Sequence, residues 1–216
     1  MEGPATALAV RTRRPSVALR QALLDAAELE FATHGFDAAS TRSIAERAGA
    51  HQPQINYHFA SKEQLWRDTV DRLFGELDQA VGDGLDRADG VSGFAGVLEH
   101  FLRFSADRPS LNRIINLEAA SSSPRLDWLV ETHLMPRFDQ MADAWEVLRS
   151  DGAGAELTPE EVWAIVTSFG ALHFANAPIL TMLGEGHAVT VDQQIQRTLR
   201  LLGLPTRTDG VSHGDD

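Results

Sequence analysis

The stretch TRSIAERAGAHQPQINYHFASKEQL, residues 41–65, predicts two short helices joined by a tight turn. Ser40 is a suitable N-cap for the first helix, over 41–48. The inner face of that helix consists of Ile44, Ala45 and Ala48. Gly49 ends it, and the second helix, over about 52–58, tolerates a proline in its first turn. The stretch therefore predicts a helical hairpin of the helix-turn-helix kind.

Amphipathic helices are expected on both sides of this hairpin. The upstream helix runs from about Ser16 to Thr33 with apolar residues at helical spacing, and Gly35 ends it. Downstream, Ser61 and Gln64 fit a capping box that starts a long helix. Further helices are predicted over 91–106, from Pro109, from Pro124 with a kink at Pro136, from Pro159 to about Leu183 with a bend near Pro178, and over 191–202. The prediction is an all-α fold of about nine helices.

Four regions follow from this pattern. Residues 1–15 are predicted to be a flexible basic arm, and residues 16–61 a helix-turn-helix domain. Residues 62–205 would form a larger helical domain, and residues 206–216 a disordered tail. Arg11, Arg13 and Arg14 in the arm are either a DNA-contacting extension or part of a solvated tail.

Composition narrows the class of protein. Of the 216 residues 43% are hydrophobic, which is enough for a sizeable core, and no cysteine is present. The sequence has neither a transmembrane run nor a secretory signal pattern, so a cytoplasmic location is expected. The net charge is −12, but residues 11–67 carry 8 Lys/Arg against 6 Asp/Glu, a local balance of +2. Phosphate contact depends on local charge, so nucleic acid is an admissible partner.

Polar chemistry separates two interpretations of the hairpin. It is either an ordinary corner in a helical bundle or a reader of a DNA groove. Donors and acceptors surround the second helix, where only Ile55 and Phe59 are clear core anchors. A helix lying in a major groove exposes such groups, because amides read base edges while hydroxyls and cations reach phosphates.

The run from Thr41 to Lys62, together with the FATHGF segment at 31–36, resembles the TetR family of bacterial repressors. The resemblance covers Ala18 to Leu65 and implies homodimeric binding to operator DNA under the control of a small effector. It places base contacts on Arg42, Gln52, Pro53 and Asn56, and phosphate contacts on Thr41, Gln54, Tyr57, His58 and Lys62. His51, at the start of the second helix, is a further candidate. Family members often have tyrosine where this chain has Asn56, and asparagine pairs naturally with adenine.

By the same resemblance, the middle helices hold an effector and the last two long helices form the dimer. Candidate pocket residues are His100, Phe101, Phe104, Asn116, Glu118, Trp128, His133, Met141, Trp145, His173, Phe174 and Asn176. Because no Arg/Lys cluster accompanies them, a largely apolar effector is expected. Candidate interface residues are Ile165, Phe169, Leu172, Ile179, Val191, Ile195, Leu199 and Leu202, with Gly170, Ala171 and Ala175 permitting close helix approach. The alternative is that these are core residues of a single chain.

An enzyme is the main rival class. The sequence has no P-loop, HExxH or GxGxxG motif, and its histidines lack metal-ligand spacing, so neither cofactor nor metal is predicted. Gly210–Gly214 matches a nucleophile elbow by chance, since the chain ends two residues later. The sequence therefore predicts a repressor released from a palindromic operator, with an activator or a regulator without a ligand as the alternatives.

Overall fold

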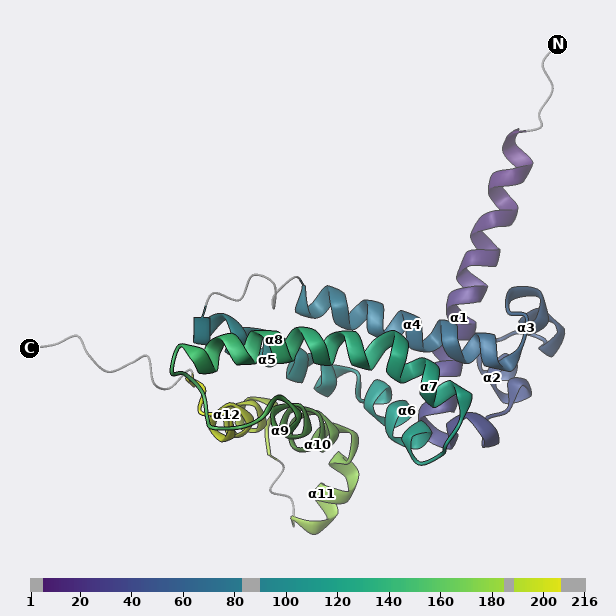
Figure 1. Cartoon of the computed structure of the whole chain (residues 1–216). Coiled ribbons are helices and arrows are strands. Elements are labelled where there is room, and N and C mark those ends of the chain that lie inside the picture. The colour runs from purple at the N-terminus through teal and green to yellow at the C-terminus, as the bar shows by residue number, and fades with distance from the viewer. Residues whose placement is uncertain (1–5, 83–89, 185–188, 207–216) are drawn as a thin grey trace, which may run out of the picture. The chain divides into compact units, whose positions relative to one another are not determined.

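The computed structural model describes residues 6–82, 90–184 and 189–206. All regular elements in these ranges are helical, which confirms the predicted fold class. The elements are α1 (Thr6–Ala38), α2 (Thr41–Arg47), α3 (Gln52–His58), α4 (Lys62–Val81), α5 (Gly90–Asp107), α6 (Pro109–Ala119), α7 (Pro124–Leu129), η1 (Val130–Leu134), α8 (Met135–Ser150), α9 (Pro159–Ala164), η2 (Ile165–Ala171), α10 (Leu172–Ala175), α11 (Ala177–Leu183) and α12 (Val191–Leu201) (Figure 1). The segments η1 and η2 are π-helical turns that divide two of the expected long helices.

Contacts divide the chain into two compact units, Met1–Leu73 and Phe74–Asp216. The division falls inside α4, whereas the sequence placed it at Lys62. The first turns of α4 belong to the N-terminal unit because their apolar side chains are buried there. Trp66, for example, is 1% exposed and packs edge-on against Phe36, with ring centroids 6.4 Å apart.

The core of the N-terminal unit joins one face of α1 to the inner faces of α2 and α3. Its buried side chains are Leu23, Leu24, Ala27, Phe31, Ile44, Ala45, Ile55, Phe59 and Leu65. The predicted caps are confirmed, since the hydroxyls of Ser40 and Ser61 accept hydrogen bonds from the backbone N–H of Ser43 and Gln64. The Gln64 side-chain amide nitrogen also donates to the Asp68 carboxylate, one turn along α4. Gly49 has a φ of +65°, which glycine adopts at no steric cost.

The N-terminal segment differs from the prediction. The helix α1 begins at Thr6, ten positions before the expected start at Ser16, so residues 6–15 are not a non-helical arm. Six of the ten residues are alanine, leucine or arginine, which favour a helix without an apolar stripe, whereas Pro15 and the two threonines oppose it. Gly35 interrupts α1 with a φ of 71°, close to the predicted stop, and a last turn continues to Ala38.

The core of the C-terminal unit is made by α5, α8, α9 with η2, and α12, which lie together in Figure 1. Its buried side chains include Phe94, Leu98, Leu102, Met141, Trp145, Leu148, Val162, Val166, Ile195, Leu199 and Leu202. Trp145 is fully buried, and its indole N–H donates to the Leu157 carbonyl oxygen at 2.9 Å. The predicted capping box at Thr158 and Glu161 is present and fixes the start of α9.

Two irregularities follow from proline. Pro136 lacks the N–H that would continue the helix ladder, and the π-turn η1 directly precedes it. The Arg137 side chain donates to the His133 carbonyl oxygen at 2.8 Å. The bend predicted near Pro178 is confirmed, because Pro159–Ala175 and Ala177–Leu183 form an angle of 77°.

Among the described residues, no single helix is long and apolar enough to cross a membrane, although the bent pair Pro159–Ala175 and Ala177–Leu183 meets those criteria jointly. The Gly210–Gly214 motif and the predicted tail beyond Thr206 lie outside the described residues.

Candidate nucleic-acid interface and ligand pocket

Helix α3 has one buried residue, Ile55, and a buried C-cap, Phe59. These two anchors fix the helix on its unit and leave its other side in solvent. The exposed positions are His51, Gln52, Pro53, Asn56 and Tyr57, while Gln54 and His58 are half-buried. Tyr57 is 80% exposed, an unusual state for a large aromatic side chain. The polar side of α3 predicted from the sequence therefore faces outward.

Hydrogen bonds at the start of α3 order part of this surface. The Gln52 amide donates to the Thr41 hydroxyl at 3.3 Å, so the first residues of α2 and α3 lie side by side. The Gln54 side-chain oxygen accepts from the His51 N–H at 2.8 Å and caps α3. Gln54, which the resemblance assigns to phosphate, thus has a structural task in the protein without DNA.

A buried carboxylate sets the position of α2. Glu30 on α1 is 4% exposed and accepts from the Ser40 N–H at 3.1 Å and the Ser43 hydroxyl at 3.0 Å. Both donors belong to the N-terminal end of α2, where unpaired N–H groups favour a negative charge. Glu30 therefore holds the helix-turn-helix against α1, a role that the sequence analysis did not identify.

The two cationic candidates each have a partner within the N-terminal unit. Arg42 is exposed and donates to the Glu46 carboxylate at 2.9 Å, and this hydrogen bond and charge raise the pKa of Arg42. Lys62 donates to the Asp37 carbonyl oxygen at 3.2 Å, and its ammonium lies 4.7 Å from the centre of the Phe36 ring. These two contacts therefore fix the position of the Lys62 ammonium group at the start of α4.

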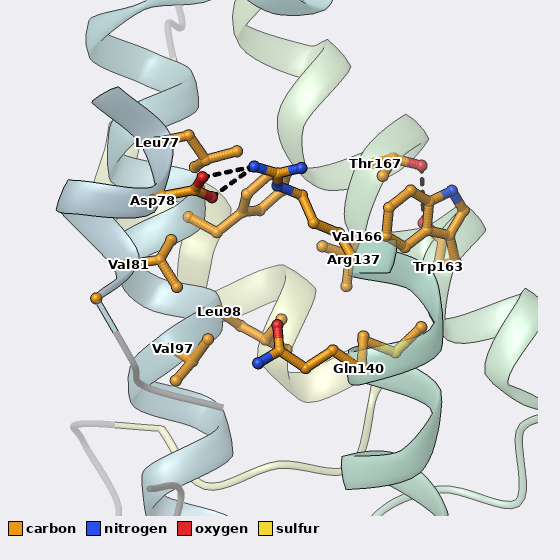
Figure 2. A pocket seen from close by; sticks show the side chains of 13 residues that line it. Leu77, Asp78, Val81, Val97, Leu98, Arg137, Gln140, Trp163, Val166 and Thr167 are labelled. Carbon is orange, nitrogen blue, oxygen red and sulfur yellow. Dashed lines mark hydrogen bonds and ion pairs between the residues drawn. The ribbon is translucent and has the colours of Figure 1, made fainter. Parts of the chain in front are cut away.

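A separate cavity lies in the C-terminal unit, with a volume of about 120 Å³. Its walls come from the last turns of α4 and from α5, α8, α9 and η2, and most of the lining side chains are apolar (Figure 2). The polar lining includes the Arg137 guanidinium, which donates two hydrogen bonds to Asp78, at 2.6 and 2.7 Å. Gln140 and Thr167 complete the polar lining.

Two of the predicted pocket residues, Phe101 and Met141, line this cavity. Phe104 and Trp145 are buried in packing, and Glu118 is buried beside Arg125 at 3.2 Å. His133 stacks on Phe74, with ring centroids 4.2 Å apart, and meets Trp128 edge-on. His100, Asn116 and Asn176 are exposed, and Phe174 packs against the core.

His173 lines a second hollow, of about 300 Å³, together with Phe169, Leu180 and Arg197. Burial, and then the positive charge of Arg197, lower the pKa of His173. Sequence reasoning missed Asp78, Arg137 and Trp163 in the first cavity. No local pattern marks them, because the Asp78–Arg137 pair joins positions 59 residues apart.

The predicted interface residues divide into two groups. Ile195, Leu199 and Leu202 are 1%, 2% and 0% exposed inside the core of their own chain, which corresponds to the intramolecular alternative. Gly170 also serves internal packing, since a Cβ atom there would lie 2.6 Å from a Leu102 methyl group. In contrast, Phe169 is 43% exposed.

The remaining predicted interface residues include Ile179, which is 59% exposed, and the half-buried Ile165, Leu172 and Val191. Helix α11 has no buried residue, and Met182 and Leu183 on it are 85% and 76% exposed. The apolar surface that the C-terminal unit leaves open is thus concentrated on α11 and the nearby Phe169.

Residues 23–69 match the family model described as bacterial regulatory proteins, tetR family. The segment 23–69 of this chain is therefore similar to the TetR family. The match covers most of the stretch on which the resemblance was based, and it includes all of α2 and α3. TetR-family proteins are transcriptional regulators and not enzymes.

Individual relatives agree with this assignment. The chain is 39% identical over 71 residues to the HTH-type transcriptional repressor KstR2 of Rhodococcus jostii, an alignment that covers 31% of this chain and 35% of the repressor. A TetR family transcription regulator from Marinobacter aquaeolei has a similar structure, with a TM-score of 0.64 and 20% identity over 89% of this chain and 100% of that one. FadR of Bacillus subtilis, solved with stearoyl-CoA, is also similar in structure, with a TM-score of 0.64. Its sequence is 16% identical, and the match covers 85% of this chain and 97% of FadR. At such low sequence identities, these structures show that the C-terminal unit has the same fold, and they show nothing about its function.

Proposed function

We propose that this chain is a transcriptional repressor that binds operator DNA as a homodimer and leaves it when a small effector binds the C-terminal unit. The observation that carries the proposal is α3, a helix anchored by Ile55 and Phe59 and otherwise polar and exposed. Its length and polar side suit a DNA major groove.

Two kinds of contact follow from the exposed groups. Gln52 and Asn56 present amides, which pair with base edges and favour adenine. Tyr57, Lys62 and the Thr41 hydroxyl suit phosphate oxygens. Arg42 reaches a base or a phosphate only by leaving Glu46, and an exposed ion pair of this kind is weak. Asn56 is therefore the main candidate for specificity and Lys62 for general affinity.

A homodimer supplies the second recognition helix. Two copies of α3 engage successive half-sites when their centres lie about one DNA turn apart, roughly 34–36 Å. The exposed apolar residues of α11 and Phe169 are the surface that supports self-association in the isolated chain. An inverted repeat in the operator is the expected consequence of a two-fold axis.

Effector control is supported by the cavity beside Asp78 and Arg137. The helix α4 begins in the N-terminal unit, and its last turns, which include Leu77 and Asp78, line that cavity. A ligand that moves those turns therefore acts on the helix that starts at Lys62. FadR, a structural neighbour, was solved with stearoyl-CoA. A cavity of about 120 Å³ is too small for an 18-carbon chain, so a smaller effector is proposed here.

Repression is proposed over activation because the similar KstR2 proteins are transcriptional repressors. A DNA partner also implies a cytoplasmic location. An activator uses the same DNA contacts, and only the position of the operator relative to a promoter distinguishes the two. A reporter gene driven by the natural promoter region that contains the operator decides this point, since a repressor lowers its expression.

The DNA claim is tested by selection from a random pool of duplexes with the full-length protein, followed by sequencing. The expected result is enrichment of an inverted repeat with half-sites about ten base pairs apart. The Asn56→Ala variant serves as a matched control, and it should enrich a pool with relaxed preference at one base pair per half-site. Selection without any enriched sequence would contradict the proposal.

A further inference from the structure

Among the described residues that line it, the cavity of the C-terminal unit has a single positive and a single negative side chain. Arg137 and Asp78 face each other across one side, as Figure 2 shows, and the other walls are largely apolar. The two charges neutralise each other, so the cavity as it stands has no net charge. A ligand that enters it meets mainly apolar walls, one ion pair, and the side chains of Gln140 and Thr167.

The two members of this pair are held very differently. The Arg137 side chain is 24% exposed, donates to the His133 carbonyl oxygen at 2.8 Å and stacks over Phe74 at 4.6 Å from the ring centre. These contacts do not involve Asp78 and keep the guanidinium in place without it. The Asp78 side chain is 60% exposed, so water can solvate its carboxylate as soon as the pair opens.

This asymmetry makes Arg137 a replaceable docking point for an anion. Both Asp78 oxygens accept from one guanidinium nitrogen, Nη2, while Nη1 donates to the His133 carbonyl oxygen, and a ligand carboxylate accepts from Nη2 in the same way. An incoming carboxylate reproduces both bonds, and the displaced Asp78 recovers its hydration. A neutral ligand of the same shape would have to leave the pair intact or break it without replacement.

Volume and lining set the rest of the ligand. The cavity measures about 120 Å³, and an apolar cavity of about 150 Å³ in another protein binds benzene. One ring or a chain of about six to eight carbons therefore fills it. Leu77, Val97, Phe101 and Met141 provide apolar contact for such a group.

We propose that the effector is a small apolar monocarboxylic acid whose carboxylate takes Arg137 from Asp78. The proposal deepens the proposed function and rests on it, because it assumes that this cavity is where the effector acts. Asp78 belongs to the last turns of α4, so its release frees that end of the helix from α8. Arg137 then selects the ligand by binding its carboxylate, and the release of Asp78 transmits ligand binding to α4.

The experiment compares acids with neutral analogues of equal size. Benzoate, phenylacetate, hexanoate and octanoate are titrated into the full-length protein by calorimetry, each beside the alcohol with the same skeleton. At least one acid is expected to bind with a Kd about tenfold or more below that of its alcohol. The proposal is overturned if none of the acids binds at millimolar concentration, or if each alcohol binds as well as its acid.

Variants separate the two charges. Arg137→Gln should abolish the preference for acids, whereas Asp78→Asn, which removes the competing carboxylate, should tighten acid binding by about fivefold. Arg149→Gln is the matched control, because Arg149 is on the same helix and pairs with Glu146 outside the cavity, and it should change nothing. If Arg137→Gln does not fold, Asp78→Asn still decides, since unchanged or weaker acid binding in that variant would overturn the proposal.

DNA anisotropy, measured separately, tells the two proposals apart. Acid binding that depends on Arg137 but leaves operator affinity unchanged supports the site and contradicts effector control. Operator binding by a protein that takes up no acid supports the proposed function and overturns this inference.

Discussion

Chemical acetylation of Lys62 is the most selective perturbation that the chain offers, because Lys62 is its only lysine. An acetylating ester followed by hydroxylamine, which reverses ester products, modifies only Lys62 and the N-terminal amine. Acetylation removes the positive charge. The loss is local, since the ammonium is held over Phe36 and on the Asp37 carbonyl at the start of α4.

The expected magnitude follows from counterion release. Each phosphate contact contributes a slope of about −0.9 to log Kobs against log[salt]. Relative to 1 M salt, counterion release from one contact strengthens binding at 0.15 M salt by about fivefold. Loss of that contact therefore weakens binding at 0.15 M salt by about fivefold, and loss of two contacts in a dimer by about thirtyfold. The salt slope of a dimer should become shallower by about 1.8.

The assay is fluorescence anisotropy with operator and with scrambled DNA at several salt concentrations, before and after acetylation. Both DNAs should lose affinity by the same factor, because a phosphate contact carries no sequence information. The Lys62→Arg variant is the control, since it keeps the charge but resists the reagent. It should bind DNA normally and remain unaffected by treatment, which isolates any contribution of the N-terminal amine.

A second reading of the same reaction tests contact directly. Operator DNA should slow acetylation of Lys62 while the N-terminal amine serves as an internal reference. The reasoning is refuted if acetylated protein retains the affinity and salt slope of the untreated protein, or if bound DNA leaves the rate of Lys62 labelling unchanged.

Three further predictions concern stability. Glu30→Ala should lower the free energy of unfolding of the N-terminal unit by about 2–4 kcal/mol and weaken DNA binding, because two hydrogen bonds to a buried carboxylate are lost. An unchanged free energy of unfolding in urea would contradict this prediction. Leu199→Ala should lower the free energy of unfolding by about 2–5 kcal/mol. Leu201→Ala, at a position 51% exposed, should change it by no more than about 0.5 kcal/mol. Equal changes in the two variants would contradict the burial of Leu199 in the core of its own chain. Burial and Arg197 lower the pKa of His173, so the unfolded chain binds more protons and stability should fall as pH drops below about 6.5, its ordinary value. His173→Gln should flatten this pH dependence in thermal unfolding, and an unchanged profile would count against it.

The helix-turn-helix was predictable because its determinants are local. Ser40, Gly49 and Ser61 specify helix ends within four residues of themselves, and the structure follows each of them. The start of α1 was missed for the opposite reason. An amphipathic pattern detects a helix that packs on one side, and residues 6–15 form a helix on propensity without such a pattern.

The C-terminal unit shows a different limit of sequence reasoning. The stripe containing Ile195 and Leu199 correctly indicated a buried face of α12. Hydrophobic periodicity indicates that a helix face is buried, but it does not indicate whether the same chain or a partner buries it. Here residues of the same chain bury this face of α12. The cavity was harder still, because Asp78 and Arg137 are ordinary charged residues until the fold brings α4 and α8 together.

The central claim, that α3 reads DNA sequence, is tested most directly by one ratio. It is the Kd for scrambled DNA divided by the Kd for the selected operator, measured at 0.15 M salt for the wild type and Asn56→Ala. The account predicts a wild-type ratio of at least about 10³. It also predicts that Asn56→Ala lowers this ratio by about 5–150-fold per half-site, equivalent to about 1–3 kcal/mol, without altering binding to scrambled DNA. A wild-type ratio near one, or a ratio that Asn56→Ala leaves unchanged, would contradict it.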